Sequence, residues 1–251
     1  MLSLFASLSI ATAAFTGAFL SGIFGMAGGQ IVLAVLLYFL PVSAAMTMFS
    51  ALMFSGGAWR AGLWRKHIDW SIAVRYIAGS VLGMGLMLLI LFVPSKPVVY
   101  LGLGLTPFLG DMLPKKWRPD ITQRGMGFLC GFIAMILQIA VGGAGNVLDM
   151  FFQNSPLTRY AIVATKAFTL LFSQLMRFLY FGVAALDGGE NLPVELFAIC
   201  VLLTFAGGTA AVGLLKRLTD DSFRKWTKWL IYGMSIIYVA RGLWLLWTGE
   251  Y

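Results

Sequence analysis

Four ionisable residues lie inside long apolar stretches of the sequence, where a charge is costly to bury. They are Asp149, Lys166, Arg177 and Arg241. An ionisable side chain within a membrane segment is by default a functional candidate. Lys166, Ser173 and Arg177 are spaced by seven and four residues, so on one helix they form a single stripe. The formal sum of the four charges is +2, which a mono- or dianion in transit would balance.

Structural roles for the same charges stay open. Asp149 is a candidate for ion coupling, but it can also simply pair with Lys166 or Arg159. Arg177 lies about 10 Å from the expected end of its helix, so its side chain can extend outward to the membrane surface. For Arg241, which is close to an external end, this snorkelling is the favoured role.

Two glycine clusters each introduce a short apolar piece, at residues 30–40 and 144–155, that ends near a proline. Both pieces are too short to span alone, which is typical of half-helices that return through the membrane. A helix that begins inside the membrane presents free N–H groups and a positive dipole end, which suit an anion. The candidate binding residues at the two starts are Gly28, Gly29, Gln30, Gly142, Gly143, Gly145 and Asn146. Close helix packing by the glycines, and hydrogen bonds from the amides to neighbouring backbone, are the structural alternatives.

Hydroxyl side chains follow each half-helix and complete the candidate site. Thr47 and Ser50 come after the first and Thr165 after the second, so we predict that they line the anion site together with Lys166 and Arg177. Such hydroxyls more often bond a carbonyl one turn back in their own helix. Gln138 is a third buried amide, but it does not stand at a half-helix start.

Composition excludes several classes of protein. The chain has 251 residues, of which 60% are hydrophobic and only 11% are charged, and its mean hydropathy is +0.88. A soluble domain has about 25% charged residues. An ordinary soluble enzyme, a disordered chain and a nucleic-acid-binding domain are therefore excluded, and an integral membrane protein in a lipid bilayer is expected.

The chain lacks the residue patterns of metal and cofactor sites. It has one histidine, and its two cysteines lie in apolar stretches. No HExxH, phosphate loop, GxSxG elbow or carboxylate dyad is present. We expect no metal, no cofactor and no enzymatic activity.

Basic residues set the expected orientation. They gather at 60–75, 115–124 and 216–228, whereas the other connections carry few. By the positive-inside rule the basic loops are cytoplasmic and both termini are periplasmic. No Lys or Arg precedes Arg60, so a cleaved signal peptide is not expected. The predicted full spans are 4–25, 44–59, 72–93, 98–110, 125–141, 160–183, 193–214 and 226–248.

The two halves of the chain follow one pattern. A glycine cluster, a half-helix, a proline and an Ala-x-Thr or Val-Ala-Thr segment recur in that order. We predict a first membrane repeat at 1–113, a cytoplasmic linker at 114–124 and a second repeat at 125–251. The fold class is an all-α membrane protein of two inverted repeats, with about eight full spans and two half-helices, up to ten segments. Pairs of small residues such as Gly79 and Gly83 can pack helices within one chain or between two, so a homodimer is possible.

The Gly-x-x-Gly-Gly cluster at 25–29, the half-helix that ends in Pro41 and the segment Arg60-Ala61-Gly62 to Ile68-Asp69-Trp70 resemble the TauE/SafE family, also called the toluene-sulfonate-uptake permeases or four-span permeases. The resemblance covers nearly the whole chain. It implies transport, usually export, of sulfur-containing anions such as sulfite or organosulfonates including sulfoacetate. Where members commonly carry a third glycine, this chain carries Gln30, and Asn146 takes the comparable place in the second half.

These observations predict a secondary transporter, an exporter of small sulfur-containing anions that works by alternating access in a bacterial cell inner membrane. An anion channel of the same fold, or a carrier of another small carboxylate or oxyanion, is the alternative. A non-transporting membrane subunit is a third possibility. An intramembrane enzyme is disfavoured.

Overall fold

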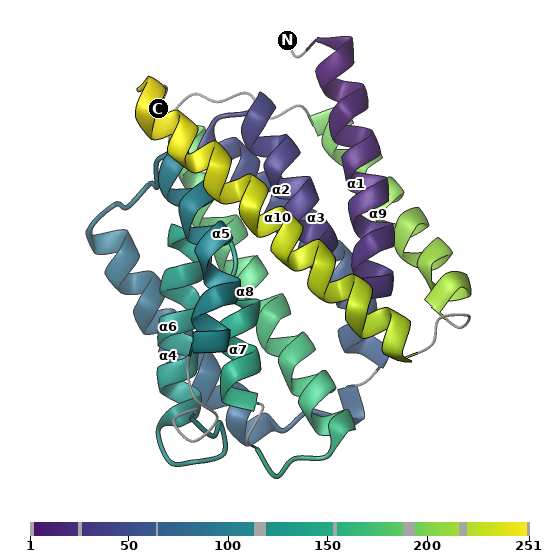
Figure 1. The fold of residues 1–251 in the computed structure, drawn as a ribbon. Helices are drawn as coiled ribbons and strands as arrows, with labels where there is room; N and C mark the ends of the chain where they lie inside the picture. The colour runs from purple at the N-terminus through teal and green to yellow at the C-terminus, as the bar shows by residue number, and fades with distance from the viewer. Residues whose placement is uncertain are drawn as a thin grey trace.

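The computed structural model describes residues 3–24, 27–63, 65–112, 119–152, 155–187, 194–215 and 220–249. In this part of the chain the fold is entirely helical (Figure 1). The α-helices are α1 Leu4–Phe24, α2 Ala27–Phe39, α3 Val42–Leu63, α4 Trp70–Leu89, α5 Lys96–Met112, α6 Met126–Ala140, α7 Gly145–Phe152, α8 Arg159–Asp187, α9 Val194–Leu215 and α10 Asp220–Thr248, with a short 3-10 helix, η1, at Arg65–His67.

The helices have the length and composition of membrane segments. Four contain stretches long and apolar enough to cross a bilayer, at 4–21, 70–89, 160–183 and 229–248. Shorter apolar stretches lie in α2, α3, α6 and α9. Many large apolar side chains face outward on these helices, including Val81 and Leu82 of α4. The predicted all-α membrane fold is confirmed, and the protein is a multi-pass membrane protein; the number of complete crossings stays a prediction.

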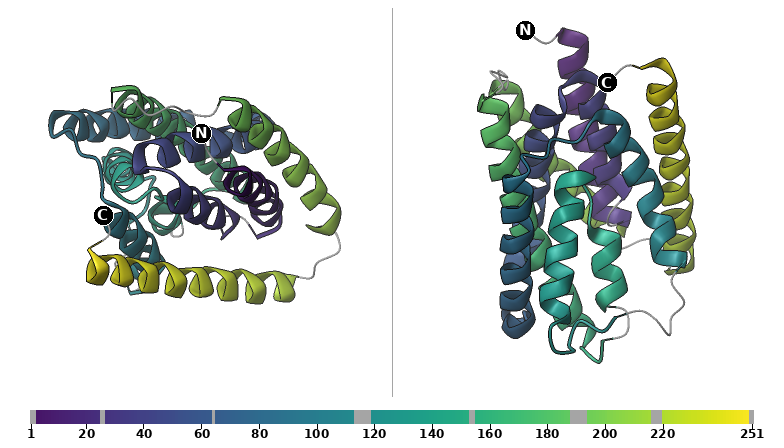
Figure 2. Two further views of the ribbon diagram at one scale, coloured as in Figure 1. Left: turned by 90° about the horizontal axis from the view of Figure 1, so that it is seen from above. Right: turned by 90° about the vertical axis from the view of Figure 1, so that its left-hand side faces the viewer.

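α2 and α7 are the two shortest α-helices of the described residues, and neither is long enough to cross a bilayer. α2 has 13 residues and α7 has 8, about 20 Å and about 12 Å at 1.5 Å per residue, against a hydrocarbon core of about 30 Å. α7 follows a non-helical turn that contains Gly142 and Gly143, whereas residues 25 and 26, before α2, lie outside the described residues. Figures 1 and 2 show α1 and α2 in the upper part of the bundle and α6 and α7 in the lower part. The helix pairs α1–α2 and α6–α7 therefore extend into the bundle from opposite ends.

The contacts between helices repeat between the two halves of the chain. The most extensive ones join α1 to α9, α4 to α6, α3 to α8 and α5 to α10. Replacing each helix by the one five places away turns the α1–α9 pair into the α6–α4 pair and leaves the other two pairs unchanged. Atomic details repeat too. A Cβ on Gly79 would lie 2.0 Å from the Phe128 carbonyl oxygen between α4 and α6, and one on Gly207 would lie 2.4 Å from the Phe15 carbonyl oxygen between α9 and α1.

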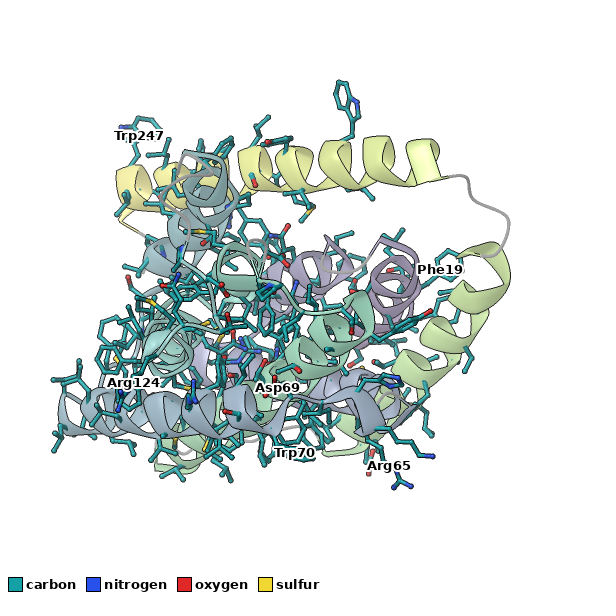
Figure 3. All side chains as sticks on the ribbon, turned by 90° about the horizontal axis from the view of Figure 1, so that it is seen from below. Phe19, Arg65, Asp69, Trp70, Arg124 and Trp247 are labelled. Carbon is teal, nitrogen blue, oxygen red and sulfur yellow. The ribbon has the colours of Figure 1, made fainter. Side chains whose placement is uncertain are left out.

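Both chain ends lie at the upper end of the bundle in Figure 1, and the turns at 119–125 and 155–158 lie at the lower end. In the view from below, Arg65 points away from the bundle (Figure 3). The membrane side that each end faces, and the division into repeats at 114–124, stay predictions. Residues 114–118 of the predicted linker lie outside the described residues.

Candidate functional site

Arg177 of α8 is fully buried and joins three parts of the fold. Its Nε donates to the Ser50 hydroxyl of α3 at 2.7 Å. One terminal nitrogen donates to the Gly142 carbonyl, between α6 and α7, at 2.5 Å. The other donates to the Gln174 side-chain oxygen, three residues earlier on α8, at 2.6 Å. The guanidinium therefore links α3, α8 and the break that precedes α7.

The chain reaches Gly142 through a left-handed turn. α6 ends at Ala140, and the Gly142 N–H still bonds the Gln138 carbonyl at 3.1 Å. Gly142 then has φ +86°, a region that favours glycine. A Cβ there would also lie 2.9 Å from Leu33 of α2 and 3.1 Å from Met46 of α3. The positive φ favours glycine at this turn, which presents its carbonyl to the guanidinium.

Arg177 carries a charge that the described residues do not neutralise. Its three hydrogen-bond acceptors are all uncharged, and no carboxylate in the described ranges forms an ion pair with it. One face lies over the Phe49 ring, with Cζ 4.6 Å from the ring centroid. A guanidinium has five N–H donors and stays protonated. Two donors thus remain beyond the three bonds, and the buried positive charge has no acidic partner among the described residues.

Two buried amide side chains have an atom without a partner. Gln138 is 1% exposed, and its Nε2 has no hydrogen-bond partner. It lies one turn before Gly142, whose N–H its own carbonyl accepts. Gln30, in the first turn of α2, has a buried Oε1 without a partner, while its backbone carbonyl accepts the Tyr238 hydroxyl at 2.5 Å. An unsatisfied buried donor is costly, which makes Gln138 Nε2 a candidate anion ligand.

A buried polar stripe runs along α8 toward Arg177. The Thr169 hydroxyl bonds the Lys166 carbonyl, and the Ser173 hydroxyl bonds the Thr169 carbonyl and meets the Tyr76 hydroxyl of α4 at 2.8 Å. At the other end Lys166 forms an ion pair with Asp149 of α7. Lys166 and Arg177 are about 16 Å apart along the helix. Lys166, Ser173 and Arg177 thus lie along one side of α8, and of the two cations only Arg177 is fully buried.

Several predicted site residues have structural partners. Gly28 packs against α1, where a Cβ would lie 1.9 Å from the Gly17 carbonyl oxygen, and Gly29 faces Phe49 and Met53 of α3. The Thr47 hydroxyl donates to the carbonyl of Ser43 at 2.8 Å, one turn back.

The remaining candidates are Thr165 on α8 and three residues at or just before the start of α7. The Thr165 hydroxyl accepts the Asp69 N–H at 2.9 Å and so fixes the start of α4. Gly143 faces Leu103 of α5, and Gly145 begins α7. Asn146 follows on α7, but its side chain lies outside the described residues. The ligand roles of all these residues stay predictions.

Sequence reasoning missed two partners of Arg177. Gln174 carried a usable signal, because it stands three residues before Arg177 and so shares its helix face. Phe49, beside the predicted Ser50, carried none, because an aromatic residue in an apolar run is unremarkable. Snorkelling, the structural alternative for Arg177, is excluded by its complete burial.

The described chain is a multi-pass helical membrane protein with a fully buried arginine, without an acidic partner among the described residues, beside the turn between α6 and α7. The sulfite exporter TauE/SafE family matches residues 9–238, nearly the whole chain. The protein belongs to the TauE/SafE family, a family of transporters rather than enzymes. No curated protein and no solved structure matches it.

Proposed function

We propose that this protein is a secondary transporter that exports small sulfur-containing anions, such as sulfite or organosulfonates, across the bacterial cell inner membrane. One observation carries the proposal. Arg177 is fully buried, is held by three uncharged acceptors and has no carboxylate partner among the described residues. A buried charge of this kind is costly unless it is paired, and a bound anion would supply the pair.

The binding site in this proposal lies around the break between α6 and α7. Arg177 supplies the charge and Gln138 Nε2 supplies an uncharged donor. Gln30 and Asn146, at the starts of the two half-helices, are further candidate donors. Arg177 is 0% exposed, so an anion reaches it only after α3, α6 or α8 moves.

An alternating-access mechanism is supported by the helix contacts, which correspond between helices five places apart in the chain. If the two halves are inverted repeats, each conformation of one half has a counterpart in the other, and the site opens to either side in turn. In this mechanism the basic loops face the cytoplasm and both termini face the periplasm. The ion pair of Asp149 and Lys166 joins α7 to α8, and we assign it to the coupling or gating of the cytoplasmic side.

The first test is ligand-dependent thermal unfolding of the purified protein in detergent. The panel contains sulfite, methanesulfonate, sulfoacetate, taurine, sulfate, phosphate and acetate at matched ionic strength. A ligand at 100 times its dissociation constant stabilises the folded state by about 2.7 kcal/mol. Stabilisation by a sulfur oxyanion or sulfonate is expected, and stabilisation by acetate or phosphate alone would contradict the proposed substrate.

Flux through proteoliposomes tests the carrier mechanism. A carrier exchanges substrate, so unlabelled anion on the far side accelerates the movement of labelled anion. Large conductance without such acceleration would indicate a channel. Arg177→Met is the matched inactive variant, since it removes the charge and keeps an apolar side chain of similar length.

A further inference from the structure

We infer that the central site is built for an anion with a single negative charge, such as hydrogen sulfite or an alkanesulfonate, and rejects dianions. The inference rests on the proposed function, because it concerns the substrate of the same site. It begins from the charges that the structure leaves unpaired around Arg177.

Arg177 is the one fully buried cation of the described chain without an acidic partner. Its acceptors are the Ser50 hydroxyl, the Gly142 carbonyl and the Gln174 amide oxygen, all of them uncharged. A monoanion beside the guanidinium makes the buried group neutral. A dianion leaves one negative charge uncompensated in a low-dielectric interior, where such a charge is strongly disfavoured.

The second cation of the α8 stripe does not change this balance. Lys166 is paired with Asp149, so the two together contribute no net charge. They lie about 16 Å along the helix from Arg177, and their side chains are 21% and 51% exposed, so solvent screens them further. A second acidic group on a substrate would find no free cation among the described residues of the stripe.

Gln138, one turn before the Gly142 that accepts from Arg177, adds an uncharged donor to the proposed site. Gln138 Nε2 is a buried donor without a partner, and Arg177 has two N–H donors beyond its three bonds. Together they offer donors to several oxygens but only one unit of charge. Sulfonate and hydrogen sulfite present several acceptor oxygens and carry a single charge.

The test compares methanesulfonate with sulfate, which have similar size and shape but differ by one charge. Binding to the full-length protein in detergent is measured by calorimetry at constant ionic strength. We expect the dissociation constant of sulfate to be at least about 100-fold higher than that of methanesulfonate, equivalent to about 2.7 kcal/mol. Equal affinity for the two, or tighter binding of sulfate, would overturn the inference while leaving the proposed function intact.

Sulfite provides a second measurement on one compound. As the pH rises through its second ionisation, hydrogen sulfite is converted to the dianion. If only the monoanion binds, the apparent dissociation constant for total sulfite rises toward tenfold per pH unit, while that of methanesulfonate stays constant. A sulfite affinity that is independent of pH, or that improves at high pH, would contradict a monoanion site.

Gln174→Glu changes the charge of the site with almost no change in shape. It places a carboxylate oxygen where the amide oxygen now accepts from Arg177 at 2.6 Å. The guanidinium is then neutralised internally, so we expect methanesulfonate affinity to fall at least about 100-fold while the melting temperature without ligand is unchanged or raised. Gln123→Glu, on the exposed turn before α6, makes the same change at the surface and is the matched control, with affinity within about twofold of the wild type.

The outcomes separate the two claims. No binding of methanesulfonate, sulfate or sulfite by the wild type would overturn the proposed function together with the inference. Sulfate affinity equal to or higher than that of methanesulfonate, or unchanged methanesulfonate affinity in Gln174→Glu, would overturn the inference alone.

Discussion

Replacing Arg177 by methionine is expected to abolish anion binding with little effect on stability. The substitution removes the charge and three hydrogen bonds from a position that is completely buried. Two opposing contributions to the free energy of unfolding decide the effect on stability.

The variant loses stability because hydrogen-bond acceptors of Arg177 become unsatisfied. The Gly142 carbonyl and the Gln174 amide oxygen each lose a donor, at about 1–3 kcal/mol each. Ser50 is less affected, because its hydroxyl still donates to the Met46 carbonyl at 2.6 Å. The total loss is roughly 2–6 kcal/mol.

The variant gains stability because a buried charge that has no acidic partner among the described residues is removed. Burial of an unpaired ion costs several kcal/mol after relaxation, and methionine packs in its place without that cost. The two contributions nearly cancel, so we expect a net change within about 3 kcal/mol, or within about 10 °C in melting temperature for a chain of this size.

The assay measures both properties on the same preparation, as the melting temperature without ligand and its shift with methanesulfonate. Arg177→Lys is the companion variant, because it keeps the charge and loses the planar set of donors. We expect weakened binding in the lysine variant and none in the methionine variant. A methionine variant that still binds methanesulfonate with wild-type affinity, or that loses far more than 3 kcal/mol of stability, would refute the reasoning and make Arg177 a structural residue.

Three further predictions concern the surrounding residues. Gly79→Ala is expected to destabilise the protein by about 1–3 kcal/mol, because its Cβ would lie 2.0 Å from a backbone oxygen. Gly85→Ala on the same helix has open space around it and should be neutral or stabilising. Equal melting temperatures of the two variants would contradict the close packing at Gly79. Gln138→Leu removes the unpartnered buried donor, so unfolding experiments should show equal or higher stability and a dissociation constant for methanesulfonate at least about tenfold higher; unchanged affinity would remove Gln138 from the site. Asp149→Asn breaks the ion pair with Lys166, so transport in proteoliposomes should change at least severalfold with equilibrium affinity within about twofold, and a normal transport rate would exclude a gating role.

The membrane segments were predictable because the bilayer fixes their length and composition. Residues 30–40 and 160–183 were predicted as segments and form α2, Ala27–Phe39, and α8, Arg159–Asp187. The second half-helix, predicted at 144–155, is described as α7, Gly145–Phe152, and residues 153 and 154 of the predicted segment lie outside the described residues.

The bonds that make the candidate site were not predictable in the same way. Arg177 and Ser50 are 127 residues apart in sequence, and Arg177 and Gly142 are 35 apart. No periodicity within one segment encodes which segment packs against it. The site depends on the packing of α8 against α3 and on a left-handed turn at Gly142, and both are tertiary features.

The charge available to a substrate shows most clearly what tertiary structure adds. The sequence gives a formal sum of +2 for the four intramembrane ionisable residues, which would suit a mono- or a dianion. In the structure Lys166 and Asp149 neutralise one another, and Arg241 is only partly buried, with Cζ 5.8 Å from the Tyr38 ring centroid. Arg177 alone remains buried and unpaired within the described residues. The sum of +2 already contains the Lys166–Asp149 pair at no net charge, so it consists of Arg177 and Arg241. Because Arg241 is only partly buried, the buried site keeps the single charge of Arg177, and the expected substrate carries one charge rather than two.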